Sequence, residues 1–126
     1  MTVLQTDRTN RLKRFIPMMF KEPPAEEDVS WMLEENLRLP ESIASAVLFD
    51  QTMQDYRQDL SKVNVPTLIV FGGAENKVVP LAAGEHLHEN ISGSTLVVFD
   101  NSSHCPFLEE PDRFNQEVDH FIQSLA

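Results

Sequence analysis

The sequence has little cysteine and no long apolar segment. Its 126 residues include a single cysteine, so an internal disulfide is excluded and a reducing compartment fits best. No apolar run approaches the roughly 20 residues that a membrane-spanning helix needs. Residues 1–14 are polar and lack the apolar core of a secretory signal. We therefore expect a soluble, cytoplasmic protein that does not enter a membrane.

Basic residues are also scarce. Ten lysines and arginines stand against twenty acidic residues, which gives a formal net charge of −10. Such a charge disfavours nucleic acid and anionic membrane surfaces as partners, and a solvated acidic surface accounts for it. Hydrophobic residues make up 41% and charged residues 24%, a composition typical of a globular domain.

Two apolar, β-branched runs in the second half of the chain predict parallel strands. Thr67–Phe71 and Thr95–Phe99 lack polar alternation, which is typical of strands covered by helices on both faces. Leu81–Asn90, which begins after a proline and ends before Ser92-Gly93, predicts the helix between them. A final helix should start at Pro111, because apolar residues recur on one face of it to the end of the chain. These elements predict a β-α-β-α unit of the α/β class.

The first half contains helical patterns and no strand pattern. Apolar residues recur at helical spacing in segments 12–19, 29–37 and 43–53, each interrupted or followed by proline or polar residues, with a short fourth at 56–60. We therefore divide the chain into a helical region, 1–60, and an α/β region, 61–126. All five methionines lie in the helical region. They fit core packing, or a plastic cover over an apolar ligand, because thioethers adapt to irregular shapes.

Two strands are too few for a stable sheet covered on both faces. Either another chain supplies further strands, or the sheet is completed by self-association. We therefore expect a homo-oligomer or a complementing amino-terminal half as partner.

A series of motifs in fixed order runs from about Tyr56 to the end of the chain. An acidic residue and arginine precede a leucine, and a Val-Pro-Thr-Leu strand, a glycine turn, a serine-histidine pair, a glutamate-proline pair and a phenylalanine-bearing helix follow. The residues are Asp55-Tyr56-Arg57-Gln58-Asp59-Leu60, Val63–Val70, Gly72, Pro80, Ser103-His104, Glu110-Pro111, Phe114 and Phe121. This order resembles the carboxyl-terminal part of an α/β-hydrolase, in particular the small esterases, enol-lactonases and cofactor-free haloperoxidases. The helical first half resembles the cap domain of that family.

The resemblance implies roles for three residues. His104 occupies the position of the general base, which takes a proton from a serine and returns it to the leaving group. Asn76 stands at the acid position, four residues before Pro80, and an amide does not stabilise an imidazolium as a carboxylate does. Glu75 is a possible substitute acid or an exposed turn residue. Ser103 replaces the family's usual glycine before the histidine.

The sequence also departs from the family in having no nucleophile elbow, Gly-x-Ser-x-Gly. Ser102 and Ser103 lie in a turn, not a strained elbow. Cys105 directly follows His104, and adjacent loop residues rarely reach the geometry that a thiolate nucleophile and its base require. His86 and His88 diverge on the predicted helix, so they do not form a zinc site. We expect no cofactor and no metal.

Three functions remain open on these grounds. The first is the carboxyl-terminal part of an α/β-hydrolase acting on a small ester, lactone or similar acyl compound, without efficient turnover by itself. The second is a non-catalytic module, derived from a hydrolase, that binds an apolar small molecule or a partner helix. The third is a truncated product stabilised by self-association along its open sheet edge.

Overall fold

The computed structural model describes residues 3–75 and 77–126. They divide into two compact units, each described here by itself. The first unit comprises Met1–Met18 and Glu22–Asp55, and the second comprises Met19–Lys21 and Tyr56–Ala126. The short segment Met19–Lys21 therefore packs with residues that follow it far along the chain.

The second unit is built on two parallel strands, as the apolar runs predicted. β1 (Leu68–Gly72) pairs with β2 (Thr95–Phe99) in the register Leu68 to Thr95 through Gly72 to Phe99. β1 begins one residue later than predicted, although the carbonyl of Thr67 still accepts the amide of Thr95 at 2.9 Å. Within the described residues the sheet has these two strands alone.

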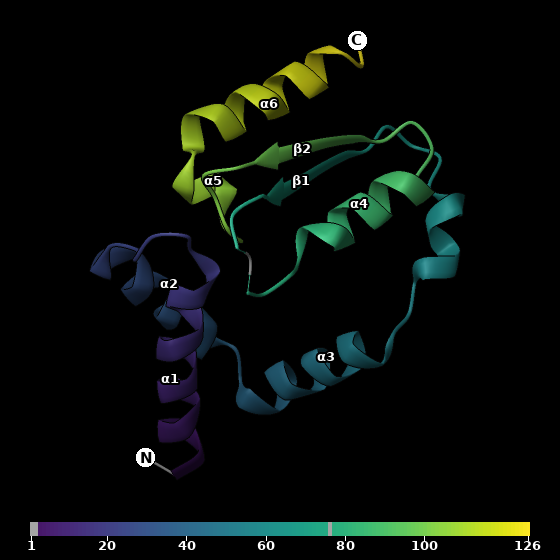
Figure 1. Ribbon diagram of the computed structural model, residues 1–126. Helices are drawn as coiled ribbons and strands as arrows, with labels where there is room; N and C mark the ends of the chain where they lie inside the picture. Colours follow the sequence, from purple (N-terminus) through teal and green to yellow (C-terminus); the bar gives the residue numbers. More distant parts are fainter. Residues whose placement is uncertain (1–2, 76) are drawn as a thin grey trace. The chain divides into compact units, whose positions relative to one another are not determined.

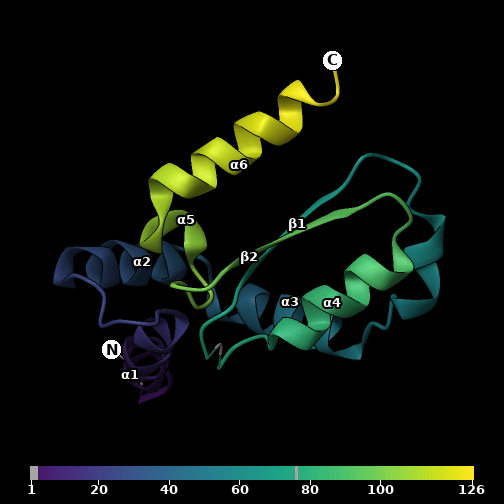
Figure 2. The same ribbon diagram turned by 45° about the horizontal axis from the view of Figure 1, so that its top comes forward.

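Helices lie on both sides of the two strands. Figures 1 and 2 show α4 (Leu81–Asn90) on one side and α6 (Pro111–Gln123) on the other. The bounds of α4 and the start of α6 at a proline agree with the sequence prediction. α4 packs closely because Gly84 faces the ring of Phe71, and a Cβ there would come within 2.6 Å of a ring carbon.

The core of this unit is small because the sheet is narrow. Phe99 is fully buried, and its ring lies 6.3 Å from that of Phe114 on α6. Ile69 of β1 is also buried, whereas the other residues of β1 before Gly72 are half-buried. The expectation of strands fully covered on both faces therefore holds only at a few positions, because each strand has one neighbour.

The remaining elements of the second unit are short. η2 (Arg57–Lys62) precedes β1, and α5 (Pro106–Glu109), which the sequence pattern did not predict, lies between β2 and α6. Gly93 has a φ of +72°, a left-handed conformation that glycine adopts without strain, and it forms the turn from α4 into β2.

The first unit is helical, as predicted. It contains α1 (Val3–Phe15), η1 (Ile16–Met19, whose last residue belongs to the second unit), α2 (Glu26–Arg38) and α3 (Glu41–Met53). The guanidinium of Arg8 on α1 donates to the carbonyls of Asn36 and Leu39 at 2.7 and 2.8 Å, which ties α1 to the end of α2. None of the helices in the described part of the chain is long and apolar enough to cross a bilayer.

Candidate active-site loop

The loop that follows β2 carries His104. A turn begins as β2 ends, where the amide of Ser102 donates to the carbonyl of Phe99 at 3.0 Å. His104 is half-buried, while Ser102, Ser103 and Cys105 are fully buried. The histidine is therefore presented from the carboxyl end of a parallel strand, the edge at which α/β sheets place their binding and catalytic groups.

The histidine loop lies directly against the turn that follows β1. The amide of Gly73 donates to the carbonyl of Phe99 at 2.8 Å, and the amide of Ala74 donates to the carbonyl of Ser102 at 3.0 Å. The hydroxyl of Ser103 donates to the carbonyl of Glu75 at 3.3 Å. The structure therefore brings the backbones of the two segments that carry the predicted site residues together.

Gly72 explains how the two segments come so close. A Cβ built on this glycine would lie 1.7 Å from the carbonyl oxygen of Ser103 and 2.4 Å from that of Ser102. Both contacts are with backbone atoms, which cannot turn aside as a side chain can. Glycine is required at this position because the histidine loop occupies the space of a side chain.

The two serines beside His104 have structural roles. The hydroxyl of Ser102 donates to Oε2 of Glu110 at 2.6 Å, and both serines have no exposed surface. A nucleophile must reach its substrate and must be activated by a base. Both hydroxyls are buried, and they donate their hydrogen bonds to a carboxylate and to a backbone carbonyl. They are therefore not placed to act as a nucleophile.

Glu109 joins the histidine loop to a distant segment of the chain. Its Oε2 accepts the amide of Ser103 at 2.8 Å, and its Oε1 accepts the amide of Lys21 at 2.6 Å. The amide of His104 donates to the carbonyl of Met19 at 2.8 Å, and Nζ of Lys21 donates to Oδ1 of Asn101 at 3.1 Å. Segment Met19–Lys21 therefore runs along the histidine loop and is hydrogen-bonded to it.

The two candidates for the acid position differ in what the structure says of them. Asn76 lies outside the described residues. The side chain of Glu75 is exposed, and it is the backbone carbonyl of this residue that contacts the histidine loop. The structure thus places the backbone of Glu75 beside the histidine loop, and the acid partner of the imidazole remains a prediction.

Cys105 is a buried thiol. Burial, together with the negative charge of Glu109, raises its pKa from the ordinary value of 9.0 to about 11. The thiolate is the nucleophilic form of cysteine. At neutral pH this side chain is therefore protonated and unreactive, as expected for a structural thiol.

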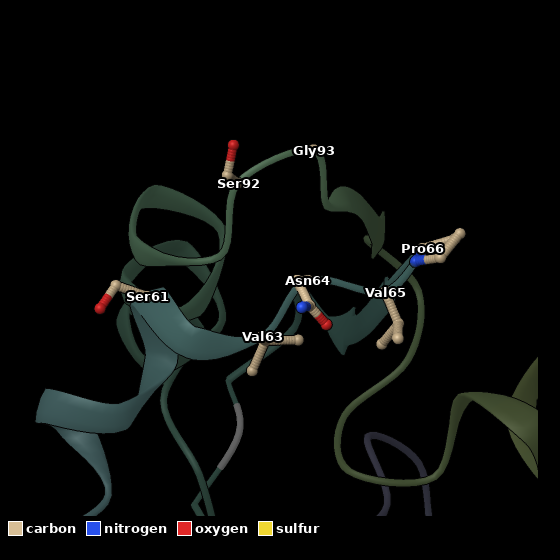
Figure 3. Close-up of a pocket in the computed structure, with 7 residues that line it drawn as sticks. All are labelled: Ser61, Val63, Asn64, Val65, Pro66, Ser92 and Gly93. Atoms are coloured by element: carbon tan, nitrogen blue, oxygen red, sulfur yellow. The ribbon is translucent and has the colours of Figure 1, made fainter.

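A shallow cavity lies at the opposite end of the strands. It has a volume of about 510 Å³ and is formed by residues just before β1 and β2: Ser61, Val63, Asn64, Val65, Pro66, Ser92 and Gly93. The hydroxyls of Ser61 and Ser92 point in different directions, so they do not converge on one ligand atom (Figure 3). In residues 3–75 and 77–126, no three metal-binding side chains are grouped as a metal site.

Sequence reasoning missed Glu109 and Arg113. Arg113 donates to the carbonyl of Val98 at 2.9 Å and stacks over the ring of Phe99 at 4.2 Å. The acidic pair Glu109-Glu110 just after the histidine loop was a usable signal, since carboxylates placed there can accept loop amides. The partner segment Met19–Lys21 gave no signal, because its contact with Glu109 spans 88 residues.

The parallel strands, the flanking helices and the histidine loop at the carboxyl edge define an α/β protein of the hydrolase type. A family model described as "Alpha/beta hydrolase family" matches residues 3–117. The chain therefore belongs to the alpha/beta hydrolase family, as its motifs predicted.

Several relatives of the chain are esterases. A pimeloyl-acyl-carrier-protein methyl ester esterase of Neisseria meningitidis is 30% identical over 96% of this chain and 39% of its own length. The structure of an esterase from Exiguobacterium antarcticum has a TM-score of 0.83 and 31% identity over 94% of this chain and 44% of its own. An esterase from Rhodococcus has a TM-score of 0.79 and 26% identity over 99% and 45%. The chain thus spans less than half the length of these relatives.

Proposed function

We propose that this chain provides the base-bearing part of an esterase-type active site, with His104 as the general base. The observation that carries the proposal is the position of the His104 loop. It lies at the carboxyl edge of the parallel strands and is hydrogen-bonded to the turn after β1 through Ala74 and Ser103. The similarity to esterases supports a small ester, lactone or similar acyl compound as substrate.

The chemistry assigned to His104 requires a partner that these 126 residues do not offer. A histidine base removes the proton of a serine hydroxyl and later protonates the leaving group. The sequence contains no Gly-x-Ser-x-Gly, and Ser102 and Ser103 are buried. Cys105 is protonated at neutral pH because burial raises its pKa to about 11. We infer that the chain alone has no efficient turnover and needs a segment that carries the nucleophile.

The acid position of the triad departs from the family pattern. Asn76 stands at the acid position, and an amide does not stabilise the imidazolium that forms during catalysis as a carboxylate does. In one serine-protease triad, replacing the aspartate by asparagine lowers turnover by about 10⁴, because the histidine takes the wrong tautomer. Glu75, one residue earlier in the same turn, is the carboxylate that we propose as the substitute.

Hydrolysis of p-nitrophenyl acetate tests the proposal in two arms. In the first, the purified chain should show only background hydrolysis, unchanged by His104→Ala; saturable turnover that His104→Ala abolishes would overturn the inference of incompetence. In the second, the chain is co-expressed with a hydrolase segment that carries Gly-x-Ser-x-Gly. Turnover should then appear, disappear with His104→Ala and fall with Glu75→Gln, whereas His120→Ala on the exposed face of α6 should leave it intact.

The free edge of β1 favours a second candidate, in which copies of the chain associate. β1 pairs with β2 on one side only, within the described residues, and an unpaired strand edge readily binds another strand. Sedimentation velocity at micromolar concentration should then show a dimer or larger species. A stable monomer would count against this candidate and leave the hydrolase assignment untouched.

The exposed apolar side chains of α3 favour a third candidate, an apolar binding module. Ile43, Val47, Phe49 and Met53 are each at least half exposed, and no residue of this helix is buried. Thermal stabilisation of the chain by small apolar ligands, without any effect from an added nucleophile-bearing segment, would support the module. The single free thiol fits the cytoplasmic location that we propose in each case.

A further inference from the structure

Glu109 uses both oxygens of its carboxylate to hold backbone amides. Oε1 accepts the amide of Lys21 at 2.6 Å, and Oε2 accepts the amide of Ser103 at 2.8 Å. Each of the two carboxylate oxygens is therefore engaged by a main-chain amide. Hydrogen bonds of amides to an ionised carboxylate are shorter and roughly twice as strong as neutral ones.

These bonds fix two consecutive amides of the histidine loop. The amide of Ser103 donates to Glu109, and the next amide, that of His104, donates to the carbonyl of Met19 at 2.8 Å. The segment that supplies this carbonyl is itself held by Glu109 through the amide of Lys21. Glu109 thus supports the histidine loop in two ways. It accepts the amide of Ser103 directly, and it accepts the amide of Lys21 in the segment whose Met19 carbonyl accepts the amide of His104.

The neighbouring glutamate does not take part in this arrangement. Glu110 accepts the hydroxyl of Ser102 at 2.6 Å and approaches Arg113 at 3.6 Å. Glu110 therefore fixes the side chain of Ser102 at the start of the loop, whereas Glu109 fixes the main chain directly before His104. The two adjacent carboxylates offer a matched pair of variants.

We propose that Glu109 is a positioning residue for His104, holding Met19–Lys21 against the histidine loop so that the imidazole is presented in one orientation. The role of His104 in this statement rests on the proposed function, while the arrangement itself does not. A base must lie within hydrogen-bond reach of the proton that it removes, so a loop free to shift would lose the reaction geometry.

Nuclear magnetic resonance of the 126-residue chain with Glu109→Gln tests the proposal. A glutamine keeps the size but places an N–H donor against one of the two amide donors. We expect the Lys21 and Ser103 amide protons to move upfield and the His104 amide to exchange about 10- to 100-fold faster, as for loss of one hydrogen bond to a charged group. The His104 ring signals should broaden or double, an effect that a purely structural role would not produce.

Glu110→Gln is the matched control. It should alter signals around Ser102 while leaving the His104 amide and ring signals as in the parent chain. If Glu109→Gln leaves the exchange of the His104 amide and its ring signals unchanged, or if Glu110→Gln changes them equally, the proposal is overturned.

A titration of the parent chain covers the case in which Glu109→Gln does not fold. The Lys21 and Ser103 amide protons should both follow the protonation of the Glu109 carboxyl, observed through its own carbon signal and distinguished from that of Glu110. Separate midpoints for the two amides, or no response, would refute the arrangement. None of these measurements depends on ester hydrolysis, so the positioning role and the proposed function can fail independently.

Discussion

Replacing Gly72 by alanine should displace the histidine loop and destabilise the second unit. The added Cβ would lie 1.7 Å from the carbonyl oxygen of Ser103, half the 3.4 Å at which ordinary van der Waals contact begins. The carbonyl oxygen of Ser103 must therefore move away by a further 1.7 Å to reach ordinary contact. Because the loop is held by the bonds from Ala74 to Ser102, from Ser103 to Glu109 and from His104 to Met19, such a shift breaks or stretches them.

The magnitude follows from two opposing contributions. Overpacking against atoms that cannot turn aside costs about 1–3 kcal/mol, and each lost backbone hydrogen bond adds about 1 kcal/mol. The alanine also restricts the unfolded chain, which offsets about 0.4–1 kcal/mol. We expect the free energy of unfolding to fall by about 2–4 kcal/mol in urea titrations followed by circular dichroism. For a unit of this size that corresponds to a fall in Tm of roughly 8 °C or more.

Gly73→Ala is the matched control, because it brings the same restriction of the unfolded chain one residue later. Its Cβ would meet a methyl group of Val98 at 2.8 Å and Oδ1 of Asp100 at 2.9 Å, both in side chains, and its nearest backbone contact would be the Cα of Asp100 at 3.3 Å. We expect it to cost about 1 kcal/mol or less. The refuting result would be a Gly72→Ala variant that is as stable as Gly73→Ala and whose amide signals at Ser102–His104 do not move. The backbone of the histidine loop would then not lie against Gly72.

Two further predictions concern Cys105 and Arg113 of the same unit. Cys105 should resist iodoacetamide at pH 8 until urea unfolds the chain, because its pKa of about 11 leaves roughly one thiol in a thousand ionised. Since the folded pKa lies above the ordinary 9.0, the unfolded state loses its proton first, and the stability should fall as pH rises from 9 towards 11; Cys105→Ala should flatten this dependence. Arg113→Lys should lower the free energy of unfolding by about 1–2 kcal/mol, because lysine keeps the charge but loses the planar stacking on Phe99 and the bond to Val98. Glu117→Gln, which removes only a 3.9 Å contact with Arg113, should change it by less than about 0.5 kcal/mol.

The parts of the fold that the sequence predicted are those set by local patterns. Thr95–Phe99 and Leu81–Asn90 have the predicted bounds, because an apolar β-branched run and a proline before a helix act over a few residues. α5 escaped prediction because a helix of four residues, beginning with Pro106 itself, is too short to show periodicity. The assignment of Met19–Lys21 to the second unit depends on contacts with Asn101, His104 and Glu109, and no local pattern encodes contacts over such distances.

The candidate site, like the fold, was predictable from the sequence only where local patterns determine it. The place of His104 at the end of β2 followed from the strand pattern and the motif order, and the structure has the loop there. The need for glycine at position 72 was visible as a turn signal, but its physical reason, the approach of the Ser103 carbonyl, required coordinates. The orientation of the imidazole depends on side chains brought together in space, so neither Glu109 nor its two amides could be derived from spacing.

The histidine loop is fixed by groups that all belong to the second unit. The turn after β1 holds it through Ala74, segment Met19–Lys21 holds it through Met19, and α5 holds it through Glu109. A loop defined by three separate backbone contacts does not need the nucleophile to reach its position. If a nucleophile-bearing segment completes the site, it should therefore meet a base that is already in place, and the His104 amide should be protected from exchange before that segment is added. An unprotected amide that becomes protected only after the addition would mean that the partner, and not this chain, sets the position of the base.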